Sequence, residues 1–259
     1  MSKEISKMPV IFIGHGSPMN AIEDNEFTQN WRKLGQELPR PKAILSISAH
    51  WFTAGTRITD VEWPKTVYDM YGFPRKLYEL KYDAPGSPAL AKEVIALLSD
   101  TSVKIDNSWG LDHGTWSVLH SMYPNADIPV VQLSIDRNAP PRKHFEMGQK
   151  LQKLREEGVL IFGSGNIVHN LALVSFDDDN GFPWAYEFDQ YIKTSIINKD
   201  WDSIYNYKKA GASALKAFFT PDHFYPLLYV LGSSDSQDTF RILNESCVYG
   251  SISMTCYIS

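Results

Sequence analysis

Apolar residues occur along this chain in short, mainly apolar runs, separated by stretches in which they recur every three or four positions. The short runs predict strands of a mostly parallel sheet. These runs are residues 10–13, 41–50, 128–135 and 159–162. The periodic stretches predict amphipathic helices, of which the main ones are residues 24–38, 88–98 and 142–157.

Strand and helix therefore alternate through most of the sequence, a pattern typical of α/β proteins. We expect a single domain over residues 1–259, with three layers (α/β/α) around a mostly parallel, mixed central sheet. Residues 239–243 and 251–258 predict two late strands, which we expect to pair antiparallel at the edge of that sheet.

Composition and charge argue against several classes of protein. The net charge is −5 and the pI is about 5.8, so the chain lacks the excess of basic residues that is typical of nucleic-acid-binding proteins. The sequence has no run of 18 or more apolar residues, so it predicts no membrane span. Its first residues do not resemble a secretory leader. The two cysteines, Cys247 and Cys256, have no metal-binding spacing and predict inert buried thiols. We therefore expect a cytoplasmic protein.

Two of the predicted strands lead directly to a histidine. His15 lies between Gly14 and Gly16, which allow the backbone to turn tightly, and His50 is expected to end its strand. The carboxyl ends of strands in an open α/β sheet form the edge where ligands bind. Both imidazoles are therefore expected at that edge.

Three further histidines have a similar setting. His113 stands in a predicted loop between two tryptophans, His169 follows a strand and a Gly-Ser-Gly-Asn loop, and His223 follows a Thr-Pro-Asp helix-start sequence. The remaining two, His120 and His144, lie within predicted helices and are interpreted as structural. Five of seven histidines at strand ends and in loops predict a shared site.

The chemistry of these residues favours a metal over a catalytic triad. The sequence has no GxSxG nucleophile motif and no phosphate-binding loop, and its cysteines are out of place for catalysis. Several neutral imidazoles suit Fe(II) or Zn(II) better than Mg²⁺ or Ca²⁺. Their long-range spacing matches no zinc finger, which indicates a catalytic site with open coordination positions.

Five segments of the chain carry a more specific signal. They are GHGSPM (14–19), SAHW (48–51), WGLDHGTW (109–116), GNIVHN (165–170) and PDHFYPLL (221–228). In this order they resemble the class III extradiol ring-cleaving dioxygenases of the LigB type, and within them the single-domain branch of 4,5-DOPA extradiol dioxygenases. The resemblance extends over nearly the whole chain.

The resemblance implies a non-haem Fe(II) site with His15 and His50 as ligands. No glutamate stands in the context of the third ligand found in another branch, so the candidates are His223 and His169. We favour His223, with His169 close enough to coordinate the metal when no substrate is bound. His113 is expected to contact substrate or oxygen and to donate a proton, and His169 to act as the base if it is not a ligand.

The implied reaction inserts both atoms of O2 into the ring of L-DOPA or a similar small catechol, giving a muconic semialdehyde-type product. Zinc taken up during purification could occupy the same ligands. A zinc-dependent hydrolase on the same scaffold and a zinc-stabilised binding module are the alternatives. A homo-oligomer is possible. Five aromatic residues are expected either to wall the pocket or to lie in the core: Trp51, Tyr68, Trp109, Trp116 and Tyr225.

Overall fold

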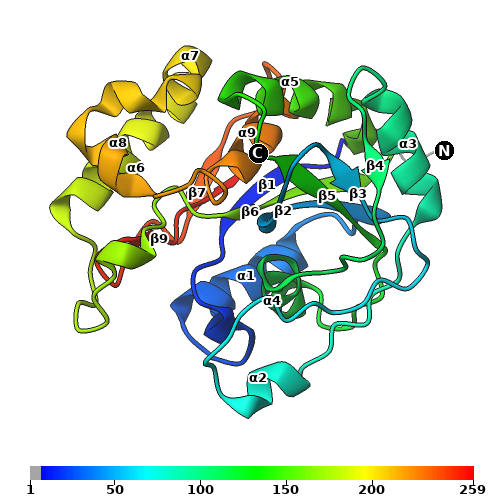
Figure 1. Cartoon of the computed structure of the whole chain (residues 1–259), viewed down its shortest axis with the longest axis horizontal. Helices are drawn as coiled ribbons and strands as arrows, with labels where there is room; N and C mark the ends of the chain where they lie inside the picture. The colour runs from blue at the N-terminus through cyan, green and yellow to red at the C-terminus, as the bar shows by residue number, and fades with distance from the viewer. Residues whose placement is uncertain (1–6) are drawn as a thin grey trace.

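A mixed sheet of eight strands runs through the computed structural model, which describes residues 7–259 (Figure 1). In sheet order the strands are β4 (Lys104–Ile105), β3 (Arg57–Ile58), β5 (Val130–Asp136), β2 (Ala43–Thr53), β6 (Val159–Gly165), β1 (Val10–Gly14), β10 (Cys256–Ile258) and β7 (Arg241–Leu243). A separate pair consists of β8 (Cys247–Val248) and β9 (Ile252–Ser253).

The centre of the sheet is parallel, as predicted. Strands β5, β2, β6 and β1 lie side by side and run in the same direction. At one edge β10 pairs antiparallel with β1, and β7 pairs antiparallel with β10, which confirms the expected antiparallel edge. At the other edge β3 runs antiparallel to β5. The predicted α/β fold with a mixed central sheet is confirmed, whereas the domain extent of residues 1–259 stays a prediction.

Helices cover both faces of this sheet (Figure 1). The longer helices are α1 (Glu26–Glu37), α3 (Pro88–Leu97), α4 (His113–Met122), α5 (Pro141–Leu151), α6 (Pro183–Ile197) and α9 (Tyr225–Gly232). The shorter ones are α2 (Arg75–Glu79), α7 (Trp201–Tyr205) and α8 (Ala212–Ala217), with 3₁₀ turns η1 (Pro18–Ala21), η2 (Gln152–Arg155), η3 (Leu171–Leu173) and η4 (Tyr207–Ala210). Within residues 7–259, no helix is long and apolar enough to cross a membrane.

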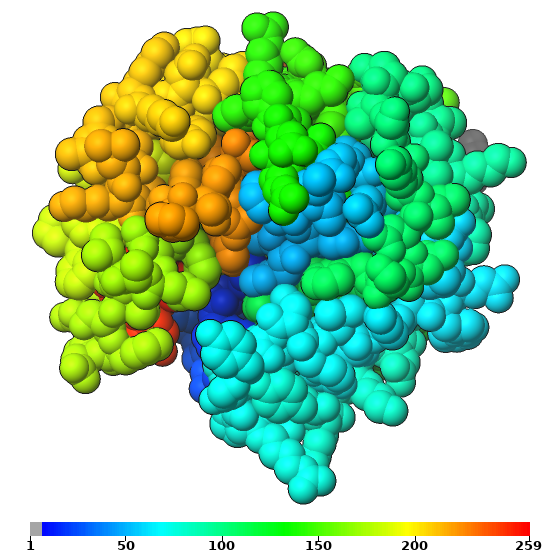
Figure 2. Space-filling model, viewed as in Figure 1, coloured from blue at the N-terminus to red at the C-terminus, as the bar shows by residue number. Residues whose placement is uncertain are grey.

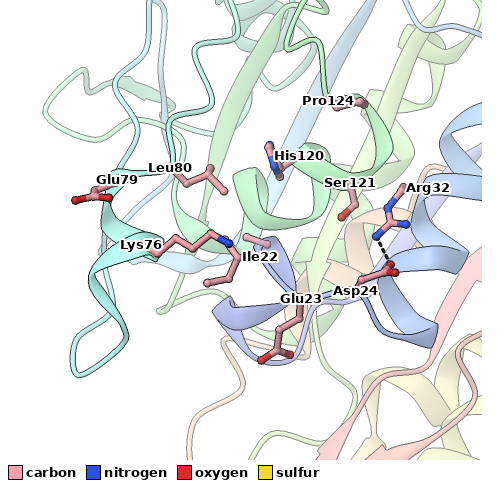
Figure 3. A pocket seen from close by; sticks show the side chains of 11 residues that line it. Ile22, Glu23, Asp24, Arg32, Lys76, Glu79, Leu80, His120, Ser121 and Pro124 are labelled. Carbon is pink, nitrogen blue, oxygen red and sulfur yellow. Dashed lines mark hydrogen bonds and ion pairs between the residues drawn. The ribbon is translucent and has the colours of Figure 1, made fainter.

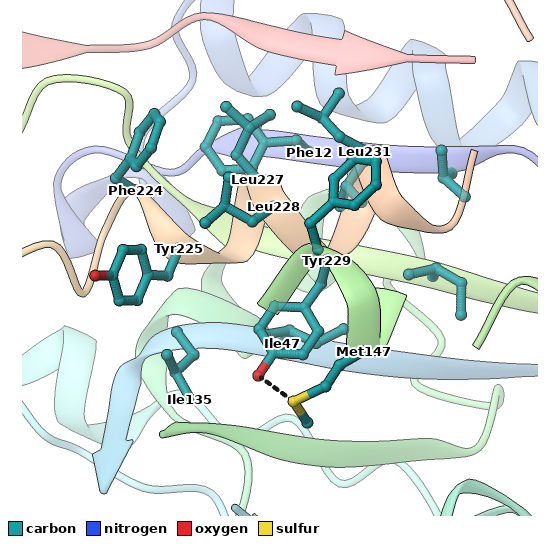
Figure 4. Close-up of a cluster of buried hydrophobic side chains, with 14 of the residues drawn as sticks. Phe12, Ile47, Ile135, Met147, Phe224, Tyr225, Leu227, Leu228, Tyr229 and Leu231 are labelled. Atoms are coloured by element: carbon teal, nitrogen blue, oxygen red, sulfur yellow. Dashed lines mark hydrogen bonds between the residues drawn. The ribbon is translucent and has the colours of Figure 1, made fainter. Parts of the chain in front are cut away.

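Side chains along β1 alternate between the two hydrophobic cores. Val10 and Phe12 pack into the core that contains α3, α5 and α9, whereas Ile11 and Ile13 pack into the core that contains α1 and α4. Figure 4 shows the first of these cores, where Leu228 of α9 packs over the sheet. Both faces of the central strands are therefore buried, which explains why these strands appear in the sequence as mainly apolar runs.

The strand that carries His50 differs from the prediction. β2 does not end at this residue but continues for three more, and its pairing with β5 shifts register between Ile47 and Phe52. Such a shift marks a bulge, which bends a strand and changes the direction of its side chains. His50 therefore lies in an irregular part of a long strand.

The setting of His113 also differs from the prediction. This residue is not in a loop but is the first residue of α4. Asp112 is the N-cap of that helix and accepts a hydrogen bond from the backbone N–H of Thr115 at 3.2 Å. An Asp-His-Gly-Thr sequence is thus a helix start here, with the aspartate as its capping residue.

Helices α5 and α9 approach each other closely through two glycines. A Cβ atom on Gly148 would collide with the backbone carbonyl of Tyr229, and one on Gly232 would collide with that of Phe145. These glycines allow α9 to pack directly on α5 while its other side contacts β6, β1 and β2. The close packing fixes the helix whose preceding turn carries His223.

Gly148→Ala is expected to lower the free energy of unfolding by about 1–3 kcal/mol, because the added methyl group must push two backbones apart. Urea denaturation of the metal-free protein measures this loss. The exposed neighbour Gln149 provides the control, since Gln149→Ala should change stability by no more than about 0.5 kcal/mol. Equal stability of Gly148→Ala and wild type would contradict the proposed contact.

Candidate metal centre

The five histidines singled out by the sequence lie together at the carboxyl edge of the parallel strands. His15 follows β1, His50 lies in β2, His169 follows β6, His113 begins α4, and His223 lies in the turn before α9. The ring centroids of the first two are 5.0 Å apart, and those of His15 and His223 are 5.3 Å apart. Segments separated by more than 200 residues therefore form one cluster.

The backbone around His15 is shaped by its glycine neighbours. A Cβ atom on Gly14 would lie 2.6 Å from the backbone of Met254, and Gly16 has a φ of +61°. The N–H of His15 donates to the carbonyl of Gly165 at 3.1 Å, which ties the turn to β6. These contacts hold the imidazole over the end of the sheet with 1% of the residue exposed.

His223 is placed by a similar close approach. A Cβ atom on Gly165 would collide with the carbonyl of His223, and the N–H of Asn166 donates to that same carbonyl at 2.9 Å. The turn before α9 therefore lies directly on the end of β6. Only glycine at position 165 allows this contact.

Each of three imidazoles has its Nδ1 atom fixed by an acceptor. His15 Nδ1 lies 3.0 Å from Ser164 Oγ, whose own hydrogen goes to the carbonyl of Gly114. His50 Nδ1 lies 3.1 Å from Asp69 Oδ2, and His223 Nδ1 lies 2.5 Å from a carboxylate oxygen of Asp222. Since these partners can only accept, the hydrogen of each neutral ring is on Nδ1 and the lone pair is on Nε2.

The nitrogens that carry the lone pairs lie in closely spaced rings. The Nε2 atoms of His15 and His50 are 3.1 Å apart, and that of His223 is buried without a hydrogen-bond partner among residues 7–259. One nitrogen from each ring forms a set whose members all lie within 4.8 Å of one another. Two imidazole nitrogens at about 2.1 Å from one metal ion would lie roughly 3 Å apart in adjacent positions. The arrangement fits a bound divalent cation.

A second cluster shares a residue with the first. His50, Asp69 and His113 also bring one donor atom each within 4.8 Å of one another. His113 Nδ1 lies 2.9 Å from Asp69 Oδ2, and its ring centroid is 3.8 Å from that of His50. Asp69 therefore contacts both rings of the second cluster, and one of them, His50, also belongs to the first.

His169 lies beside the three-nitrogen set and does not form part of it. Its ring stacks on that of His223, with centroids 3.5 Å apart and planes 5° apart. Its backbone N–H donates to Ala217 at 2.8 Å, and the residue bridges to Ile252 of β9. The stacking places His169 next to the candidate ligands at the border of the cluster.

Burial favours the neutral form of three of these imidazoles, those of His15, His50 and His169. Desolvation, and after it the neighbouring histidines, lowers the pKa of His15 and His50 well below the ordinary value. Desolvation and the neighbouring His223 likewise lower the pKa of His169. Desolvation and the nearby Asp69 raise the pKa of Asp112 to about 6. Neutral imidazole is the form that binds metals and accepts protons.

Sequence reasoning missed the carboxylates behind the rings. Asp222 stands next to a candidate histidine, so its position in the sequence was a usable signal. Asp69 lies in an irregular segment between β3 and α2 and has no motif around it. Ser164 belongs to the Gly-Ser-Gly-Asn stretch before His169, where nothing in the sequence marks it as the acceptor for His15.

The other two histidines lie elsewhere. His144 is buried between α5 and α9, where its Nδ1 lies 3.1 Å from the hydroxyl of Tyr229. His120 lines a separate pocket of about 610 Å³ between the η1 region, α2 and α4, shown in Figure 3 with Lys76 and Arg32. None of the five clustered histidines lines that pocket.

The aromatic residues expected near the site do not all have the same environment. Trp51 and Trp109 stack with centroids 6.1 Å apart. Trp116 is fully buried and packs against Tyr68, and Tyr225 packs against His144 in the core. At least Trp116 and Tyr225 are therefore core residues.

The surface is hollowed on the face shown in Figure 2. The blue N-terminal part of the chain forms part of the floor of this hollow, between the cyan segment that precedes α3 and the yellow-green segment that follows β6. The side chain of His50 remains 18% exposed, in contrast to that of His15. The cluster therefore has one side from which a small molecule can approach.

Comparison with known proteins shows the family to which the chain belongs. The family model described as the catalytic LigB subunit of aromatic ring-opening dioxygenase matches residues 5–258. The chain is 49% identical to a 4,5-DOPA dioxygenase extradiol of Escherichia coli strain K12, over 96% of this chain and 93% of that protein. It is 38% identical to one from Beta vulgaris, over 99% of this chain and 98% of that protein.

A solved structure extends the likeness to three dimensions. The crystal structure of an uncharacterized protein from Escherichia coli K12 superposes with a TM-score of 0.85 and 46% sequence identity. The alignment covers 97% of this chain and 99% of that one. The chain thus belongs to the LigB family and is an extradiol aromatic ring-opening dioxygenase of class III, the family that its histidine-bearing segments predict.

Proposed function

We propose that this enzyme uses Fe(II) to insert both atoms of O2 into the ring of L-DOPA or a similar small catechol, giving a muconic semialdehyde-type product. The observation that supports this most is the set of three imidazole nitrogens, one each from His15, His50 and His223, that lie within 4.8 Å of one another, while Nε2 of His223 has no hydrogen-bond partner in the described part of the chain. His15, His50 and His223 would hold the metal.

The reaction class favours iron. Zinc has no redox chemistry, whereas cleavage of a ring by O2 requires electrons to pass from the substrate to oxygen. When bound, Fe(II) would supply adjacent open positions for the two catechol oxygens and for O2. Zinc binds the same imidazoles and could be carried by the purified protein. Membership of a dioxygenase family argues against a zinc hydrolase and against a zinc-stabilised binding module.

Two histidines outside the ligand set are assigned to proton transfer. The Nδ1 atom of His113 is engaged by Asp69, so its Nε2 carries the lone pair and can take up a proton; the imidazolium formed in this way can then pass that proton to substrate or oxygen. His169 stacks on His223, and its lowered pKa keeps it in the neutral form that a base requires. We propose His113 as the proton donor and His169 as the base; this geometry favours His169 in that role over a fourth metal ligand.

L-DOPA is proposed as the substrate because the curated relatives from Escherichia coli and Beta vulgaris are both named 4,5-DOPA dioxygenase extradiol. Other small catechols share the two adjacent hydroxyl groups that the site would bind. A homo-oligomeric state and a cytoplasmic location stay predictions.

The central experiment measures oxygen consumption. Metal-free protein is reloaded anaerobically with Fe(II), mixed with L-DOPA in air, and followed with an oxygen electrode and by visible absorbance. We expect one O2 consumed per catechol and a new yellow chromophore, both absent in the zinc-loaded protein because zinc cannot relay electrons. No oxygen uptake with L-DOPA or a panel of other catechols would overturn the proposal.

His15→Ala and His50→Ala are each expected to abolish metal retention and activity, because two imidazoles remain where three are needed. Metal content after gel filtration and oxygen uptake provide the readouts. His120→Ala serves as a control, since His120 lies in the separate pocket and should retain both. Full activity in either ligand variant would contradict the ligand assignment.

His113→Phe is expected to keep the metal and lose most turnover, roughly 10²–10⁴-fold, because a positioned proton donor contributes about that much. Phenylalanine fills similar space without a titratable nitrogen. Metal content and kcat are measured on the same sample. Loss of metal in this variant would place His113 among the ligands instead.

A further inference from the structure

Asp69 is held firmly although its segment has no regular secondary structure. The preceding residues bridge to the strand-like stretch that leads into α4: the N–H of Val67 donates to Leu111 at 2.7 Å, and the N–H of Leu111 donates to Lys65 at 2.9 Å. The indole N–H of Trp116 in α4 also donates to the carbonyl of Val67, at 2.9 Å. The segment is thereby fixed to the start of the helix that carries His113.

The carboxylate of Asp69 makes three contacts with two histidines. Its Oδ1 accepts from the backbone N–H of His113 at 2.9 Å. Its Oδ2 lies 2.9 Å from Nδ1 of His113 and 3.1 Å from Nδ1 of His50. A carboxylate offers only acceptors, so both Nδ1 atoms must donate and both Nε2 atoms are left with their lone pairs directed away from Asp69.

The two histidines are the ion-pair partners of Asp69 in the described part of the chain. The side chain of Asp69 is 10% exposed, and no lysine or arginine among residues 7–259 forms an ion pair with it. The corresponding carboxylate behind His223, that of Asp222, forms an ion pair with one imidazole only in the described part of the chain. Asp69 therefore differs from Asp222 by serving two rings with one oxygen atom.

We propose that Asp69 is a positioning residue that sets the tautomer and orientation of His50 and His113 together, so that metal binding and proton donation depend on one carboxylate. This inference rests on the proposed function for the roles of the two rings. The contacts themselves predict effects that can be measured without substrate.

The decisive variant is Asp69→Asn. An asparagine side chain has one acceptor oxygen, which cannot serve the backbone N–H and both ring N–H groups. If its NH₂ group faces the rings, Nδ1 must accept, the hydrogen moves to Nε2, and that nitrogen can no longer bind a metal. Loss of such an outer partner typically weakens metal binding about 10–100-fold.

Two measurements on the full chain test the proposal. Zinc alone is titrated in competition with a chromophoric chelator, and long-range ¹H–¹⁵N spectra of histidine-labelled, zinc-saturated protein report the tautomer of each ring. For Asp69→Asn we expect zinc affinity to fall about 10–100-fold and the tautomer of His113 to change. Asp222→Asn is the matched control, expected to weaken zinc binding with the tautomer of His113 unchanged.

The outcomes separate this inference from the proposed function. Unchanged zinc affinity in Asp69→Asn would overturn the inference about Asp69. A weaker affinity with an unchanged His113 tautomer would also overturn it, since Asp69 would then position His50 alone. If Asp69→Asn does not fold, Asp69→Glu keeps both oxygens but displaces them, and should show the same two effects to a smaller extent. Neither readout involves catechol or O2, so a failure of ring cleavage would leave the result standing.

Discussion

Imidazole rings that face one another across a few ångströms must be neutral and must direct lone pairs, not hydrogens, at the shared point. The Nε2 atoms of His15 and His50 are only 3.1 Å apart, so this constraint is strict. An acceptor behind each ring meets it by holding the hydrogen at Nδ1. The acceptors Ser164, Asp69 and Asp222 come from three different segments. The site therefore exists only when these segments are packed together.

Close backbone packing brings the segments to this point. Gly14 allows β1 to pass against Met254, and Gly165 allows the turn that carries His223 to lie on the end of β6. Gly148 of α5 lets α9 pack closely on α5. A side chain at any of these positions would move a backbone, and the nitrogen positions depend on the backbone. The positions of the histidine nitrogens thus depend on close backbone contacts at glycines, which have no functional side chain.

The charge around the cluster is one-sided. Three carboxylates, those of Asp69, Asp112 and Asp222, surround the rings, and within the described part of the chain no lysine or arginine forms an ion pair with them. Asp112 instead accepts from the hydroxyl of Ser48, the amide of Gln132 and other N–H groups. Buried negative charge requires compensation. A divalent cation at the three nitrogens would supply it, which agrees with the donor set.

The sequence by itself determined the class of fold and the identity of the histidines. Short, mainly apolar runs predicted the parallel strands, whose two faces are both buried in the structure. Motifs around His15, His50 and His223 predicted the family that the comparisons confirm. These signals are local: they depend on neighbours along the chain, which a sequence displays directly.

Only the tertiary structure decided how the histidines are oriented and which residues hold them. Asp69 is 44 residues from His113 and has no motif, so its role follows from the fixed position of an irregular segment against α4. The stacking of His169 on His223 and the bulge at His50 likewise arise from packing between distant segments. Local sequence patterns specify which element a residue joins, whereas ångström-scale contacts between elements depend on the whole fold.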